Sequence, residues 1–189
     1  EVFETWFVVF LHHDLLIQLG GVCFYLLAVA SVYAIGRGLG FGSHLSTGVA
    51  LLYAYTPSVA IHATSCKNDI AIAGLYLFSM AILVNLLRNG VHKLFPLQRH
   101  ILILTMAFGL GFGTKAYTVF IAPGLILLTL FALGKQGLFK QTAHALNPWN
   151  FSRNKGLFGY GALLLGTAVL AIYWYARNYV VFENPFYPA

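Results

Sequence analysis

The sequence predicts an all-α, polytopic transmembrane helix bundle with about six spans plus an N-terminal interfacial helix. Three observations predict this fold: an apolar composition, long runs without charged residues, and a one-sided distribution of Lys and Arg. The 189 residues are 59% hydrophobic and only 8% charged, and the mean hydropathy is +0.78. Because soluble domains carry about 25% charged residues, this composition argues against a soluble fold.

The charge-free runs locate the helices. Several of them reach the roughly 20 residues, at about 1.5 Å rise each, that cross a ~30 Å hydrocarbon core. Their apolar character is continuous rather than alternating, which argues against the strands of a membrane barrel. The predicted spans are 15–36, 45–64, 70–87, 101–115, 117–134 and 157–176.

The two ends of the chain are predicted to lie outside the bundle. Residues 2–11 are nearly all apolar but too few to span before the polar residues His12, His13 and Asp14, so they are predicted to form a helix in the membrane interface. The chain starts without Met and stops after a Pro-rich segment, so we expect a fragment of a longer protein.

The whole chain is accordingly predicted to be a single transmembrane domain fragment. In this division, residues 1–14 are the end of an outer loop, 15–176 form the bundle, and 177–189 form an outer segment.

The basic residues orient the bundle. Eight of the 11 Lys and Arg occupy three alternate connections, and the positive-inside rule places these connections in the cytoplasm: Arg37, Arg88, Lys93, Arg99, Lys135, Lys140, Arg153 and Lys155. All five acidic residues then fall on the outer side. The net charge of +6 therefore reflects topology and gives no support to nucleic-acid binding. The chain is therefore predicted to be a multi-pass protein of the cell membrane, that is, the inner or plasma membrane.

The outer turn at 64–69 carries the first candidate site residues, Asp69 and Lys67. Asp69 is predicted to open a helix, where a carboxylate can simply cap backbone N–H groups. Ionisable groups close to membrane depth are costly and tend to be functional, so the pair can also bind a polar substrate or a metal. The two interpretations are compatible, because a capping carboxylate keeps its second oxygen.

A second outer turn follows the glycines at positions 109, 111 and 113 and contains Lys115. The positive-inside rule disfavours a Lys here, and an ammonium at headgroup level can bind the phosphate of a lipid carrier. A Lys that merely reaches the interface is the alternative. The glycines do not form a nucleotide-binding loop, since the full pattern and a preceding strand are both missing.

Arg177 is the third outer base and follows Trp174 and Tyr175, which are typical of an interfacial aromatic belt. Its planar guanidinium suits phosphate. The histidines are weaker candidates. His12, His13 and Asp14 together with His62 lack the spacing of a metal site, whereas His92, His100 and His144 are expected at the surface of cytoplasmic connections.

The order of these turns resembles a known family. The matching segments are Arg37–Phe41, Thr56–Pro57 continuing to Asn68–Asp69, Gly113–Tyr117, and Arg177–Asn178 continuing to Asn184–Pro188. Together they are similar to the dolichyl-phosphate-mannose protein mannosyltransferase-like family, glycosyltransferase family 39 of the GT-C type, and closest to its bacterial and archaeal members. The likeness covers most of the chain, although each motif alone is weak.

The resemblance implies an inverting transferase that moves a sugar from a polyprenyl- or dolichyl-phosphate carrier to an acceptor at the outer membrane face. It implies that Glu1 belongs to the first outer loop, where a carboxylate assists the acceptor, and that Asp69 and Lys115 line the cavity. The principal acidic residue of that loop is not in this chain, so activity is expected only in a longer protein. Tyr187 belongs to the last matching segment and is expected, with Lys67 and Arg177, to bind substrate.

The predicted partners are a lipid-linked sugar donor, membrane lipids and an acceptor that can be protein, lipid or glycan, with no nucleic acid. No residue is assigned to a metal, and the need for a divalent cation stays open. Two other functions compete with the transferase: half of a transporter or flippase, and a non-catalytic membrane scaffold subunit. Against a transporter, the ionisable residues gather at span ends rather than at the midplane.

Overall fold

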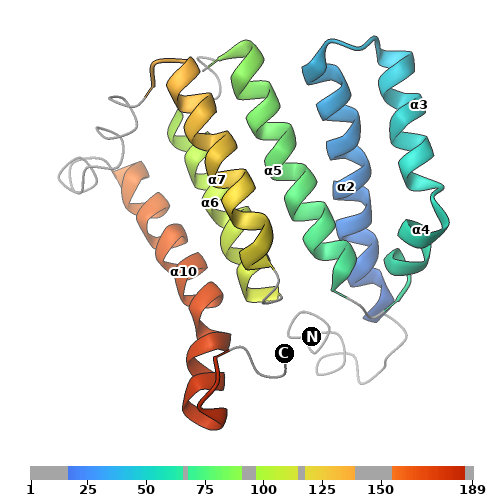
Figure 1. Ribbon diagram of the computed structural model, residues 1–189. Helices are drawn as coiled ribbons and strands as arrows, with labels where there is room; N and C mark the ends of the chain where they lie inside the picture. The colour runs from blue at the N-terminus through green and yellow to red at the C-terminus, as the bar shows by residue number, and fades with distance from the viewer. Residues whose placement is uncertain (1–16, 66–67, 91–96, 115–117, 139–154, 186–189) are drawn as a thin grey trace. The chain divides into compact units, whose positions relative to one another are not determined.

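The computed structural model describes residues 17–65, 68–90, 97–114, 118–138 and 155–185, and its regular secondary structure in these ranges is entirely helical. The predicted helical class is therefore confirmed. The helix predicted at 2–11 lies outside these ranges. The helices, drawn in Figure 1, are α2 (Ile17–Leu39), α3 (Ser43–Ala54), α4 (Pro57–Ala63), α5 (Asp69–Asn89), α6 (Leu97–Thr114), α7 (Thr118–Lys135) and α10 (Lys155–Phe182).

Among the described residues, three segments are long and apolar enough to cross a membrane. They are Gly20–Leu39 of α2, Asp69–Asn89 of α5 and Thr118–Lys135 of α7, and a shorter apolar helix covers Arg99–Thr114. These segments coincide with predicted spans, because long apolar runs without charged residues define both the predicted spans and these helices. They are compatible with a membrane protein.

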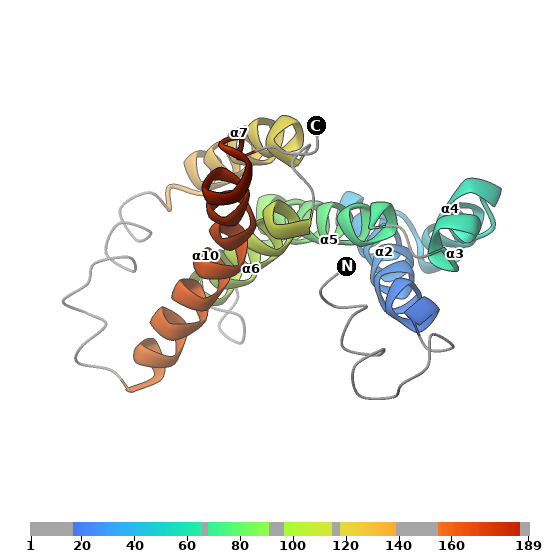
Figure 2. The same cartoon turned by 90° about the horizontal axis from the view of Figure 1, so that it is seen from below.

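The chain divides into two compact units, Glu1–Val84 and Asn85–Ala189. In the first unit, α3 and α4 both pack on α2, as both views of the ribbon show (Figures 1 and 2). Helices α2 and α3 run antiparallel, since Gly36 lies against Ser46 near one end and Tyr25 reaches Ala54 near the other.

Helix α5 starts beside the start of α2. A Cβ on Gly74 would lie 2.7 Å from the Phe24 carbonyl oxygen, and one on Gly21 would lie 3.7 Å from Ile70. Both contacts advance along the two helices in the same direction, so α2 and α5 run parallel over this stretch. Only glycine permits so close an approach of one helix to the backbone of another.

The predicted span 45–64 is wrong as a single helix, because the structure breaks it into α3 and α4. Pro57 is the first residue of α4, and the preceding Thr56 is extended, with φ −63° and ψ 121°. A proline ring disfavours the helical conformation in the residue before it and lacks an N–H for the helix ladder. The helix therefore stops at Ala54 and starts again two residues later.

The backbone carbonyl groups at this break still accept hydrogen bonds from other donors. The backbone N–H of Tyr55 donates to Leu51, and the N–H of Thr56 donates to Tyr53. The Thr56 hydroxyl donates to the Leu52 carbonyl at 2.9 Å, and the Tyr25 hydroxyl reaches across from α2 to the Ala54 carbonyl at 3.0 Å. Because a membrane interior offers no water to replace such bonds, the break is compatible with that environment.

In the second unit, α6 contacts α7 and α10. The Thr118 hydroxyl at the start of α7 donates to the Gly111 carbonyl near the end of α6, so these two helices run antiparallel. Gly109 lies against Thr167, and further along both helices the Tyr175 hydroxyl donates to the Phe112 carbonyl at 2.9 Å. Helices α6 and α10 therefore run in the same direction.

The last helix extends further than predicted. Helix α10 continues past 176, the predicted end of the span, to Phe182, and Glu183 ends it with a positive φ of 54°. The Glu183 N–H donates to the Tyr179 carbonyl. A charged residue such as Arg177 need not end a helix, whereas a left-handed residue does.

His100, expected at the surface, is only 4% exposed. It lies in the first turn of α6, three residues after Leu97 and four before Leu104, and both of these leucines are buried. Residues at these spacings share one face of a helix. His100 therefore belongs to the packed face of α6.

Candidate functional site

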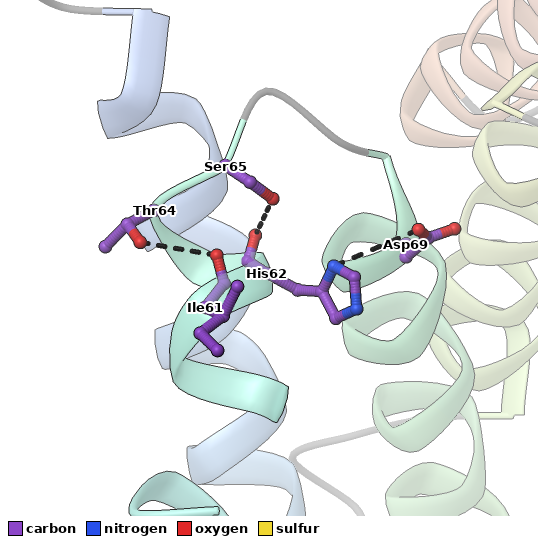
Figure 3. Close-up of polar contacts among 5 residues, drawn as sticks. All are labelled: Ile61, His62, Thr64, Ser65 and Asp69. Carbon is purple, nitrogen blue, oxygen red and sulfur yellow. Dashed lines mark hydrogen bonds and ion pairs between the residues drawn. The ribbon is translucent and has the colours of Figure 1, made fainter. Parts of the chain in front are cut away.

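The candidate site lies where α4 ends and α5 begins. Helix α4 closes at Ala63, and its last turn carries His62. The Thr64 hydroxyl donates to the Ile61 carbonyl at 3.3 Å, and the Ser65 hydroxyl donates to the His62 carbonyl at 3.3 Å (Figure 3). The Ile61 carbonyl also accepts the Thr64 backbone N–H. These local bonds take the place of ladder bonds at the end of the helix, and they fix the backbone that carries His62.

Asp69 is the first residue of α5, as predicted. The Ile72 N–H donates to the Asn68 carbonyl, so Asn68 is the capping residue and Asp69 lies one position inside the helix. Its carboxylate still lies at the positive end of the helix dipole, which favours the ionised form.

His62 and Asp69 face one another across the turn. The distance from His62 Nδ1 to Asp69 Oδ2 is 4.0 Å, and the two side chains are 35% and 34% exposed (Figure 3). This separation is longer than a hydrogen bond. The Nδ1 atom itself is buried and has no hydrogen-bond partner, so the exposed surface of the imidazole belongs to its other atoms.

Close packing against α2 holds this turn. A Cβ on Gly21 would lie 2.5 Å from the Ala63 carbonyl oxygen, which directly follows His62 in the chain. The start of α2 therefore touches the backbone of the α4 end without an intervening side chain. Ile70, in the first turn of α5, also approaches Gly21. The contacts of Gly21 with both segments therefore fix the position of His62 along the start of α5.

Most of the basic residues described, with Arg177 as an exception, lie at one end of each unit. In the first unit, Arg37 is in the last turn of α2, whereas Gly21 at the other end of α2 adjoins the candidate site. In the second unit, Arg99 lies in the first turn of α6, Lys135 ends α7 and Lys155 begins α10. Given the directions of these helices, all three lie at the same end of the unit.

Arg177 lies towards the opposite end of the second unit. It is exposed on α10, two residues after Tyr175, whose hydroxyl bonds to Phe112 close to the end of α6. The structure therefore places Arg177 within α10, which continues to Phe182 and so runs into the predicted outer segment 177–189. The α6–α7 link, in which Lys115 was predicted to bind phosphate, lies outside the described residues.

The structure describes only part of the predicted site. Asp69 is in the first unit and Arg177 in the second. Glu1, Lys67, Lys115 and Tyr187 fall outside the described ranges, as do His12, His13 and Asp14. Within the described residues, no group of three His, Cys, Asp or Glu side chains could hold a metal ion. The sequence alone does not pair His62 with Asp69, although both residues flank the same turn.

Comparison with known proteins adds no relative, since no protein family, no curated protein and no solved structure matches this chain.

Proposed function

We propose that this chain is the membrane core of an inverting glycosyltransferase of the GT-C type, which moves a sugar from a polyprenyl- or dolichyl-phosphate carrier to an acceptor at the outer face of the cell membrane. In this proposal six spans cross the membrane. Helices α3 and α4 share one span, α6 and α10 supply two more, and residues 2–11 lie in the interface.

The observation that carries the proposal is the His62–Asp69 pair at the end of the first unit opposite Arg37. Under the positive-inside rule, the end with Arg37 faces the cytoplasm and the pair faces outward. A partly exposed carboxylate at that surface supports chemistry on a substrate that is anchored in the outer leaflet. The order of the sequence motifs supports the same reading.

The proposed chemistry assigns the acidic and basic groups to opposite sides of the reaction. Asp69, with Glu1, provides negative charge on the acceptor side, where a hydroxyl attacks the anomeric carbon. Lys67, Lys115 and Arg177 stabilise the lipid phosphate as it leaves and gains negative charge. Tyr187 contributes to substrate binding. The acceptor is a protein, lipid or glycan hydroxyl.

The test is transfer of labelled sugar from a polyprenyl-phosphate donor by the full-length protein and its Asp69→Asn variant. Asparagine keeps the size of the side chain and removes its charge. The helix dipole contribution makes a loss of about 0.3–1 kcal/mol in stability the expected structural effect. Transfer should fall at least tenfold at matched folded concentration, which corresponds to about 1.4 kcal/mol of transition-state stabilisation.

Glu183→Gln is the matched control, because it removes one carboxylate charge at the end of α10 outside the proposed site. It should transfer sugar at the wild-type rate. Equal rates for Asp69→Asn and wild type would remove Asp69 from the site. Absence of transfer by the full-length wild type, with donor and acceptor both varied, would overturn the transferase and leave the transporter and the scaffold subunit.

One observation favours a transporter as a second candidate. Carriers bind substrate at broken helices, and the structure breaks the predicted span 45–64 at Pro57. The carbonyl groups of Leu51, Leu52, Tyr53 and Ala54 are, however, already bonded to protein donors. Each of these oxygens therefore keeps at most one lone pair for an ion, which makes them weaker ligands than unbonded carbonyls, and we place this candidate second.

A further inference from the structure

His62 has an unusual combination of exposure and burial. Its side chain is 35% exposed, yet Nδ1 is buried without a hydrogen bond and lies 4.0 Å from Asp69 Oδ2. Leaving a buried imidazole nitrogen without a hydrogen bond costs free energy, so this arrangement needs an explanation. The nearby Asp69 carboxylate can provide one if it approaches Nδ1 during the reaction. Catalytic hydrogen bonds are often long without substrate and tighten when the substrate binds.

We propose that His62 accepts the proton of the acceptor hydroxyl at Nε2, and that Asp69 is a positioning residue that binds the N–H at Nδ1. This proposal rests on the proposed transferase function and deepens it. A neutral histidine carries its proton on only one ring nitrogen. A carboxylate beside Nδ1 selects the form with the proton there, which leaves the lone pair of Nε2 free to act as a base.

The step balances as a group transfer. The acceptor oxygen forms a bond to the anomeric carbon, while the bond from that carbon to the carrier phosphate oxygen breaks. The bonding electron pair leaves with the phosphate, and the acceptor proton moves to His62 Nε2. The resulting imidazolium is stabilised by the Asp69 carboxylate, which keeps its own negative charge throughout.

An ordinary surface ion pair does not explain the arrangement as well. Exposed pairs contribute little, and they do not require one atom of the pair to be shielded from water. Here the nitrogen that faces the carboxylate is the shielded one, and Gly21, near the start of α2, fixes the backbone beside it by packing against Ala63. Such fixed orientation is what a positioned base requires.

The first arm of the test measures sugar transfer by the full-length protein. His62→Gln should lower the rate by about 10²–10⁴-fold, the usual contribution of general acid–base catalysis. His62→Ala should regain part of the activity when free imidazole is added, because the site is partly exposed and a purely structural role would not respond to imidazole. His44→Gln, at the exposed start of α3, is the matched control and should be unchanged.

The second arm does not depend on transfer. Nitrogen-15 NMR of histidine-labelled full-length protein should show neutral His62 with its proton on Nδ1, the signal being assigned by its loss in His62→Gln. Asp69→Ala should remove this preference. Dominance of the form with the proton on Nε2 in the wild type would overturn the proposal, whatever the transfer rates.

The two arms separate the possible failures. If the wild type transfers sugar and His62→Gln does so equally fast, the role of His62 is refuted while the transferase function stands. If the wild type transfers none, the proposed function fails and the proton-transfer role fails with it, even where NMR shows the proton on Nδ1.

Discussion

The two units respond differently to a proline within an apolar segment. In the first unit, Pro57 separates α3 from α4, whereas in the second, Pro123 lies inside α7, which continues from Thr118 to Lys135. Proline removes one ladder hydrogen bond in either setting. At Pro57 the neighbouring Thr56 and the distant Tyr25 supply other donors. The comparison leads to the hypothesis that replacement donors, together with the ring, decide whether a helix breaks.

Replacing the two prolines separately tests this comparison most strongly. Pro123→Ala should raise the free energy of unfolding by up to about 3 kcal/mol, because alanine restores an N–H inside a helix at an exposed position. Pro57→Ala should lower it by about 0.4–1 kcal/mol, since the unfolded chain gains freedom while the break persists. Unfolding in detergent measures both. Similar gains for both variants would contradict the role of the donors.

Helix approach provides a second contrast between the units. Gly21→Ala should destabilise the first unit by about 1–3 kcal/mol, because the new Cβ would lie 2.5 Å from the Ala63 carbonyl oxygen. Gly124→Ala in α7 of the second unit meets open space and should stabilise by up to about 1 kcal/mol. The same unfolding assay applies. Equal effects would mean that α2 can move away from α4 without cost.

The smallest expected effect concerns the donor on α2. Tyr25→Phe removes the hydroxyl that reaches Ala54 and should cost about 0.5–1.5 kcal/mol. Tyr33→Phe on the same helix is the control, since its hydroxyl makes no hydrogen bond within the described residues. If both residues act on the break, the change in the free energy of unfolding of the Tyr25→Phe/Pro57→Ala double variant should differ from the sum of the two single changes. If the two single changes add exactly, Tyr25 and Pro57 act independently of each other.

The sequence predicted the long helices well where charges bracket an apolar run. The span predicted at 70–87 is the helix Asp69–Asn89, and that at 117–134 is Thr118–Lys135. It failed at 45–64, where Pro57 is a local signal of the break inside a continuous apolar run. The contact from Tyr25, 29 positions before Ala54, depends on tertiary packing and leaves no local pattern.

The candidate site was predicted in part. Asp69 was identified from its place at the start of a helix, and the structure adds His62 as its neighbour. The sequence groups His62 only with His12, His13 and Asp14, as candidate metal ligands. A usable signal was present, since a histidine in the last turn before a short link faces an acidic residue that opens the next helix. The exact approach of the two side chains depends on Gly21 and α2, which the sequence alone does not place.

The broken span also bears on how the protein is made. Helix α3 has 12 residues and α4 has 7, so at about 1.5 Å each they measure roughly 18 and 10 Å, and only together do they match a ~30 Å bilayer. During synthesis the two would therefore be expected to enter the membrane as one hydrophobic segment. Because α2 precedes them in the chain, Tyr25 is synthesised before Ala54. In the proposed membrane core, the donor would therefore enter the membrane before the carbonyl that it bonds.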